Sequence, residues 1–335
     1  MREQSILLAH GAGGKLMSDL IERVFLSRFS RPGAKLGDDS AVLFASNKLA
    51  FTTDAYVVEP LFFPGGDIGR LAVFGTVNDL ATAGARALWF SASFILEEGL
   101  ELATLEAVAD SMATAAKEAG VAVVTGDTKV VPRGAADKMF ITTAGVGMLV
   151  RPWPVTGAGA RPGDAVIING PIADHGIAVL SQREGLRFES DVKSDCAPLG
   201  RLVAAAMSAT DQVHAMRDPT RGGVASALND LAAQSGVCIE IDEPAVPVRD
   251  SVRAACEMLG FDPLYVANEG KMIMICPEPE AEKVVEAIRK VPEGAEAVII
   301  GRVLPEPAGQ VHAKTALGTR RIIDKPVGEL TPRIC

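Results

Sequence analysis

A stretch dense in proline and glycine divides the sequence near its middle. Residues 151–164 read RPWPVTGAGARPGD, and proline and glycine at this density interrupt both helices and strands. A chain of 335 residues is also long for one compact domain, and typical domain sizes suggest about two. We therefore expect an N-terminal domain over 1–152, a C-terminal domain over 153–324 and a flexible tail over 325–335.

Both halves of the chain mix strand and helix patterns without a strict alternation. In the first half, β-branched and aromatic stretches bounded by turns predict strands at 40–45, 50–56, 87–96, 121–125 and 139–150. Apolar periodicity predicts helices there at 15–29, 67–83 and 104–119. In the second half, strands are expected at 165–169, 264–267, 272–276 and 297–303, with helices at 172–181, 198–209, 224–234 and 280–290. This mixture predicts the α+β class, with two mixed α/β domains.

Composition and charge exclude several classes of protein. Hydrophobic residues make up 48% and charged residues 22%, which is typical of a globular protein with a full core. The net charge is -9 and there is no run of Lys or Arg, so we expect no nucleic-acid partner. The apolar stretches are shorter than a membrane span, and the first fifteen residues hold no signal-peptide core. Five cysteines without a C-x-x-C pair make neither a disulfide framework nor a zinc site, which favours the cytosol.

The common nucleotide-binding motifs are absent, but the first half offers another kind of phosphate site. Neither G-x-x-x-x-G-K-[ST] nor G-x-G-x-x-G occurs. Five aspartates lie at or near the ends of expected elements beside small residues: Asp38, Asp39, Asp54, Asp79 and Asp127. Carboxylates gathered in this way repel one another unless a cation such as Mg²⁺ lies between them. Each one alone is more readily explained as a turn or cap residue, whereas the set favours a metal site.

Glycine-rich segments are further candidates for binding an anion. Residues 10–14 read HGAGG, whose backbone N–H groups could surround a phosphate, and the alternative is a mobile N-terminal loop. Residues 218–223 read DPTRGG before an expected helix, which suits either an anion at the helix N-terminus or a capped turn. Residues 268–271, NEGK, could be an ordinary hairpin loop, and 174–176, DHG, a helix start.

The last residue of the sequence, Cys335, is the strongest candidate for chemistry. The other cysteines, at 196, 238, 256 and 276, are expected to fill apolar space. Prenylation requires a cysteine four residues from the end, which excludes it here. A thiol on a tail that no helical or strand period stiffens can act in two places, so we expect Cys335 to carry a reacting group.

Taken together, these segments resemble a known family along almost the whole chain. The matching motifs are HGAGG at 10–14, GDD at 37–39, TTD at 52–54, NDLA at 78–81, GDTKVV at 126–131, DHGIAVLSQREGL at 174–186, DPTRGG at 218–223, NEGK at 268–271 and PRIC at 332–335. The aspartate motifs are similar to those of aminoimidazole ribonucleotide synthetase, selenophosphate synthetase and thiamine-monophosphate kinase. The DHG segment with a terminal PRIC resembles the HypE family, the carbamoyl dehydratases of [NiFe]-hydrogenase maturation. One departure is Asp230, where the family pattern would place Glu.

The resemblance implies a fold, a reaction and partners. It implies a homodimer joined through the N-terminal domains, with ATP and Mg²⁺ near that interface. The carbamoyltransferase HypF would place a carbamoyl group on Cys335. ATP-dependent dehydration would then convert that group to a thiocyanate, and the HypC–HypD complex would receive it as a cyanide ligand for iron.

The resemblance also implies roles for particular residues. Cys335, Lys129 and Glu269 would be catalytic, with Lys129 and Glu269 handling protons at the nitrogen of the carbamoyl group. ATP and its phosphates would be bound by His10, Gly11, Gly13, Gly14, Asn78 and Arg221. The five aspartates would hold the metal.

Two other functions remain open at this point. A selenophosphate synthetase-like enzyme would need an early Cys or Sec, but the first cysteine of this chain is Cys196. A non-enzymatic carrier would use Cys335 to ferry a group made elsewhere, which would leave the aspartates without a purpose.

Overall fold

The structure is a computed structural model, and it describes 5–7, 10, 20–29, 48–185, 192–326 and 334–335. Several predictions therefore lie outside the described residues. These are the strand at 40–45, the start of the helix at 15–29, and the candidate site residues Gly11, Gly13, Gly14, Asp38 and Asp39.

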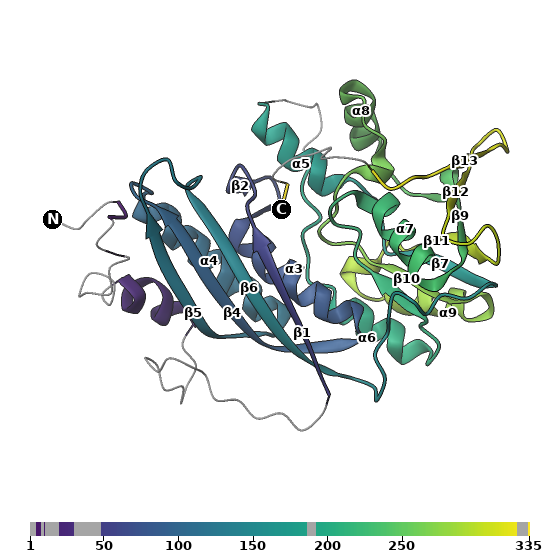
Figure 1. Cartoon of the computed structure of the whole chain (residues 1–335), viewed down its shortest axis with the longest axis horizontal. Coiled ribbons are helices and arrows are strands. Elements are labelled where there is room, and N and C mark those ends of the chain that lie inside the picture. The colour runs from purple at the N-terminus through teal and green to yellow at the C-terminus, as the bar shows by residue number, and fades with distance from the viewer. Residues whose placement is uncertain (1–4, 8–9, 11–19, 30–47, 186–191, 327–333) are drawn as a thin grey trace.

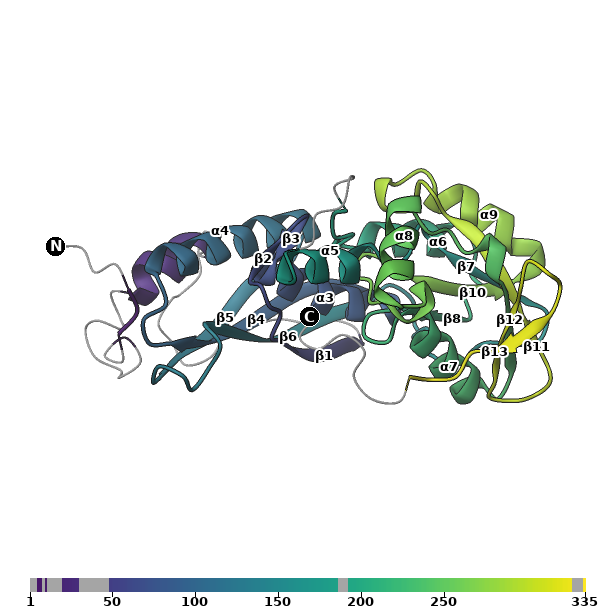
Figure 2. The ribbon, with the colours of Figure 1, turned by 90° about the horizontal axis from the view of Figure 1, so that it is seen from above.

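The first half of the chain builds a four-stranded sheet in the order β1-β6-β4-β5. Its strands are β1 (Leu49–Tyr56), β4 (Ala85–Glu97), β5 (Ala122–Val131) and β6 (Met139–Leu149). β6 pairs antiparallel with β1 and β4, whereas β4 and β5 are parallel. The crossover between the two parallel strands contains α4 (Leu102–Ala119), which packs beside α3 (Ile68–Thr82) on one face of the sheet (Figures 1 and 2).

Local sequence explains where the two helices of this layer begin and end. Asp67 caps α3, because its carboxylate accepts hydrogen bonds from the backbone N–H groups of Gly69 and Arg70. Gly120 ends α4 in the left-handed conformation that glycine adopts without strain. Short elements complete this half: η2 (Ile21–Leu26), α2 (Ser27–Phe29), β2 (Phe62–Phe63) and β3 (Gly66–Asp67).

The second half builds a seven-stranded sheet in the order β13-β12-β9-β11-β7-β10-β8. The strands are β7 (Asp164–Ile168), β8 (Ala215–Arg217), β9 (Cys238–Asp242), β10 (Ile273–Pro277), β11 (Val298–Leu304), β12 (Val311–Lys314) and β13 (Arg320–Ile322). The helices are α5 (Asp174–Arg183), α6 (Gly200–Ala209), α7 (Gly223–Ser235), α8 (Asp250–Leu259) and α9 (Glu278–Ile288), with short turns η3 (Glu243–Ala245), η4 (Pro263–Tyr265) and η5 (Pro292–Gly294). Two apolar cores, one containing α6 and α9 residues and one containing α7 residues, occupy the two sides of this sheet.

The α+β class and the two mixed domains are confirmed, while several local expectations are wrong. Residues 264–267 form no strand, because Pro263 starts the 3₁₀ turn η4 and Asp262 caps it through the Leu264 N–H group. Residues 268–271 therefore do not close a hairpin. The sequence patterns also missed α8 and six short strands, β2, β3, β8, β9, β12 and β13.

No helix among the described residues combines the length and the apolar character needed to cross a bilayer. The helix α3 contacts α6 and β8 of the second half, so it lies at the junction of the two sheets (Figure 1).

Close backbone approach between α3 and α4 gives a testable prediction. A Cβ atom at Gly69 would lie 2.5 Å from the Val108 carbonyl oxygen on α4. We expect Gly69→Ala to force the helices apart and to lower the free energy of unfolding by about 1–3 kcal/mol, measured by urea denaturation. Gly200→Ala is the matched control: it opens α6, nothing lies within 4 Å of the added atom, and stability should change by less than about 1 kcal/mol. Equal stability of the two variants would contradict the prediction.

Candidate active site

Four carboxylates from both halves of the chain lie near one another at the junction. Asp54 comes from β1 and Asp79 from α3, while Asp218 precedes α7 and Glu269 follows η4. Burial and then the charges of Asp218, Asp195, Asp54 and Asp79 raise the pKa of Glu269, so these carboxylates are within electrostatic range of it. Asp195 is paired with Lys271, and we call the other four the junction carboxylates.

Hydrogen bonds fix the two junction carboxylates of the first half. The Thr52 hydroxyl donates to Asp79 Oδ2 at 2.8 Å, and the Tyr56 hydroxyl donates to Asp54 Oδ2 at 3.2 Å. Burial raises the pKa of Asp79 to about 7, and the charges of Asp218 and Asp54 add to the rise. The charges of Asp218 and Asp54 therefore disfavour the charged form of Asp79.

Of the two junction carboxylates of the second half, Glu269 is buried, whereas Asp218 is partly exposed. Burial raises the pKa of Asp218 to about 6. Burial, followed by the charges of its acidic neighbours, raises the pKa of Glu269 well above the ordinary value for a glutamate. The Glu269 Oε1 atom is buried without a hydrogen-bond partner among the described residues. The described residues therefore supply this site with too little positive charge and too few hydrogen-bond donors.

A divalent cation would compensate this shortage, but the described residues do not supply a complete set of ligands for one ion. Asp54 and Asp79 offer the hard carboxylate oxygens that Mg²⁺ prefers. Within the described ranges, no group of three or more His, Cys, Asp or Glu side chains could hold a single ion. The predicted partners Asp38 and Asp39 lie outside those ranges, so the five-aspartate site stays a prediction.

Asp127 and Lys129 lie away from the junction carboxylates within one chain. Both belong to β5, at the opposite edge of the sheet from β1, rather than following a strand as the sequence suggested. In the strand register Asp54 aligns with Gly126 across β6 and β4, three strand spacings or about 14 Å away. Lys129 Nζ lies 2.9 Å from Asp127 Oδ2, and its hydrogen bond lowers the pKa of that carboxyl.

Asn78 joins the two halves of the chain through both ends of its amide. Its Nδ2 donates to the Ala197 carbonyl at 3.0 Å and to the Glu269 carbonyl at 3.4 Å, and its Oδ1 accepts from the Leu199 N–H at 2.7 Å. The side chain is only 2% exposed. Its predicted role in ATP binding stays a prediction, but its amide links α3 to the second half. We call these three hydrogen bonds the Asn78 clasp.

The remaining predicted binding residues lie at two different places. His10 is buried, and its Nδ1 accepts a hydrogen bond from the Leu7 N–H at 3.0 Å. Arg221 precedes α7, close enough to Cys335 that its charge opposes the rise in the pKa of that thiol. The sequence thus placed Arg221 correctly at the start of a helix.

The end of the chain is seated at the junction carboxylates. Ile334 is 2% exposed and belongs to the apolar core of the first half, and Cys335 packs against that core. The Val57 N–H donates to the main-chain oxygen of Cys335 at 3.2 Å. Burial and then the charge of Glu269 raise the pKa of the Cys335 thiol, so it is protonated in this position.

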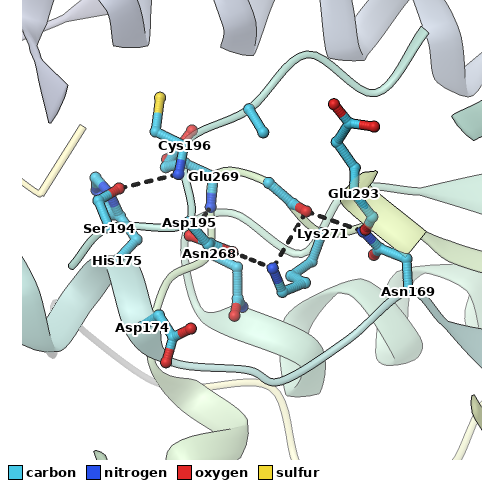
Figure 3. Close-up of polar contacts among 12 residues, drawn as sticks. Asn169, Asp174, His175, Ser194, Asp195, Cys196, Asn268, Glu269, Lys271 and Glu293 are labelled. Carbon is cyan, nitrogen blue, oxygen red and sulfur yellow. Dashed lines mark hydrogen bonds and ion pairs between the residues drawn. The ribbon is translucent and has the colours of Figure 1, made fainter. Parts of the chain in front are cut away.

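Sequence reasoning missed a buried ion pair that supports Glu269. Asp195 Oδ2 lies 3.0 Å from Lys271 Nζ, and Asp195 Oδ1 accepts from the Glu269 N–H at 3.0 Å (Figure 3). Lys271 is part of the NEGK motif, but nothing in the sequence around Asp195 distinguished that residue. Beyond the pair lies a polar cavity of about 450 Å³, lined in part by Lys271 and Arg249.

The unexplained Asp230 also has partners. Its carboxylate lies 2.9 Å from Arg217 Nη2 and 2.7 Å from Lys325 Nζ. Lys325 begins the predicted tail, so Asp230 ties the base of that tail to α7.

Comparisons with family models, with related sequences and with solved structures point to the same group of proteins. The model of the AIR synthase related protein N-terminal domain matches 37–149, and the corresponding C-terminal domain matches 161–314. Carbamoyl dehydratase HypE of Rhodobacter capsulatus is 52% identical, over 100% of this chain and 99% of its own. A crystal structure of the hydrogenase maturation protein HypE in complex with ATP has a TM-score of 0.95 and 50% identity, covering 98% of this chain and 99% of that one. A HypE–HypF complex structure has a TM-score of 0.81 and 45% identity, covering 93% and 100%.

The Asn78 clasp gives a prediction that separates two roles. Asn78→Ala leaves the Leu199 N–H and the Ala197 carbonyl unpaired, so we expect the free energy of unfolding to fall by about 1–3 kcal/mol in urea denaturation. ATP affinity, measured by calorimetry on the folded variant, should change little. Asn229→Ala, whose amide bonds only within the second half, is the control. Weak ATP binding with unchanged stability would instead support the phosphate role that the resemblance implies.

Proposed function

Because the chain belongs to the AIR synthase related proteins, and among them to the HypE carbamoyl dehydratases, we propose that it uses ATP to dehydrate a carbamoyl group on its own Cys335 to a thiocyanate. One observation carries the proposal. Burial and then the charge of Glu269 raise the pKa of the Cys335 thiol, and the charges of Arg221, Asp54 and Asp218 also act on it, so the thiol is within electrostatic range of all four groups. This supports a tail that brings its thiol to the proposed phosphate site.

The reaction explains why ATP is needed. An S-carbamoyl group must lose its oxygen and two N–H protons to become a thiocyanate, and that oxygen is a poor leaving group. Transfer of the γ-phosphoryl group of ATP to the oxygen makes it leave as phosphate, so that the products are the thiocyanate, ADP and phosphate. Mg²⁺ held by Asp54 and Asp79 would neutralise charge during the transfer, and we retain Asp38, Asp39 and Asp127 as the other proposed ligands.

Glu269 suits the removal of the protons. Its raised pKa means that it holds a proton while its acidic neighbours are charged. Burial is the main cause of the rise, and compensating the charges of the acidic neighbours would lower this pKa toward that of a carboxylate able to accept a proton. Its unpartnered Oε1 is available for that contact. We propose Glu269 as the base, with Lys129 orienting the reacting group.

Lys129 reaches such a site more readily in a homodimer. The face of the first sheet opposite α3 and α4 carries Phe51, which is 70% exposed, and Ile95, which is 37% exposed. Val146 pairs with both Phe51 and Trp89 in the strand register, so apolar side chains follow one another across this face. A second copy covering it would bury them and would bring another Lys129 and Asp127 toward the bound ATP.

The carbamoyl group must be acquired elsewhere. The inward Cys335 thiol is protonated and only partly exposed, and a thiol is a much weaker nucleophile than a thiolate. We therefore propose that the tail swings outward to receive the group from HypF, a step that the related HypE–HypF complex supports. It would later deliver its product to the HypC–HypD complex. A free reactive thiol favours a reducing compartment, so we assign the protein to the cytosol.

Asp79 tests the proposed metal site. Asp79→Asn keeps the size and the Thr52 contact but removes a hard anionic oxygen, so we expect ATP turnover to fall at least about 100-fold with the fold intact. Phosphate release by the carbamoylated protein measures it. Asp110→Asn, on the exposed side of α4, is the control and should turn over normally. An unchanged rate in Asp79→Asn would exclude Asp79 from the site.

Glu269 and Lys129 test the proton-handling end of the reaction. Glu269→Gln and Lys129→Ala should still accept the carbamoyl group but should form thiocyanate about 100-fold or more slowly. Mass spectrometry of the C-terminal peptide after one turnover distinguishes the two modifications. Cys335→Ala should accept no carbamoyl group, and Glu282→Gln on the exposed face of α9 should react normally. Wild-type protein that carries the group yet consumes no ATP would favour the non-enzymatic carrier.

A further inference from the structure

His175 lies between the end of the chain and the second half of the protein. It is the second residue of α5 and is fully buried. Its Nε2 is 2.9 Å from the carbonyl oxygen of Ile334. Its Nδ1 is 2.8 Å from the hydroxyl of Ser194, which lies beside it in Figure 3. The ring edge of Phe63 completes the packing, with centroids 5.4 Å apart at 90°.

The partners of His175 determine which nitrogen carries the proton. A carbonyl oxygen only accepts, so Nε2 must donate to Ile334. In the neutral ring Nδ1 then accepts from the Ser194 hydroxyl, whose oxygen in turn accepts from the Cys196 N–H at 3.1 Å. Burial lowers the pKa of His175, and the nearby Asp195 carboxylate only partly opposes this, which favours the neutral ring. Ser194 thus holds the imidazole with its N–H directed at the tail.

We propose that His175 is the latch of the tail: a positioning residue whose Nε2–H group holds Ile334 and so places the Cys335 sulfur beside Glu269. The inference rests on the proposed function, because it assigns a purpose to the docked tail. It goes beyond that function by naming the side chain that decides how long the tail stays docked.

The docked end is held from both halves of the chain. Val57, just after β1, donates to the main-chain oxygen of Cys335, and His175 donates to the preceding carbonyl. Both hydrogen bonds are accepted by main-chain oxygens of the tail, so they fix the position of the last two residues without contacting the sulfur. The sulfur remains available to carry a group.

The latch is also weak enough to open. It is a single hydrogen bond between neutral groups, whose net contribution is small compared with that of a charged pair. Breaking it exposes Ile334 but separates no charges. A tail held in this way can dock for dehydration and leave for carbamoyl transfer.

Alkylation of Cys335 by iodoacetamide tests the latch without relying on the reaction. The other four cysteines are buried, so modification of the C-terminal peptide, followed by mass spectrometry, reports on the undocked tail. His175→Leu leaves the Ile334 carbonyl unpaired when docked, and we expect at least about fivefold faster alkylation. His175→Gln can still donate from the position of Nε2 and should stay within about twofold of wild type. Ile177→Val, a cavity-forming change in the second-half core on the same helix, should not accelerate labelling.

A second variant covers the case in which His175→Leu does not fold. Ser194→Ala keeps the imidazole but frees its orientation, and we expect labelling to rise about two- to threefold. Wild-type labelling rates in a folded His175→Leu variant, or in Ser194→Ala if the leucine variant is unfolded, would overturn the latch.

The reaction itself provides the second readout. On carbamoylated protein, His175→Leu should form thiocyanate about fivefold or more slowly, with His175→Gln restoring the rate, while HypF-dependent carbamoylation is not slowed. If wild-type protein formed no thiocyanate, the proposed function would fail, yet the labelling comparison would still decide on the latch. If wild type formed thiocyanate and His175→Leu matched it in both assays, only the latch would fail.

Discussion

Crowded buried carboxylates are the constraint around which this protein is organised. Asp54, Asp79, Asp218 and Glu269 come from four segments, and burial together with mutual repulsion raises the pKa values of the last three. A fold that served only stability would gain from replacing such groups with apolar ones. Their presence at the junction supports the proposed Mg²⁺ site, because a cation there would relieve their repulsion.

The surrounding contacts hold this unfavourable arrangement together. Asn78 fastens α3 to the second half through three backbone groups, and the Asp195–Lys271 pair supports the backbone of Glu269 from behind. Neither set of contacts neutralises the junction carboxylates. The charge deficit therefore persists within the described part of the chain, while the geometry around it is firmly set.

Local patterns in the sequence predicted much of the fold, whereas the assembly of the site depends on long-range order. Periodicity located α3 with Asp79, and turn chemistry located the start of α7 beside Arg221. The apolar residues of 264–267 resembled a strand because burial alone gives that pattern, but Pro263 and its cap favour a 3₁₀ turn. No local signal showed that β5 lies at the far edge of the sheet, which separates Lys129 from Glu269 within one chain, or that His175 would meet the tail.

The anchoring of Lys325 by Asp230 has a kinetic consequence. Ten residues separate that anchor from the reactive sulfur, which limits its excursion to about 33 Å. Within such a volume a tethered group has an effective concentration on the order of millimolar, whatever the concentration of the protein in the cell. Re-docking of the cargo is thus a first-order event. In the proposed reaction, a tethered intermediate would therefore not have to be captured from solution, and dilution would not slow its conversion.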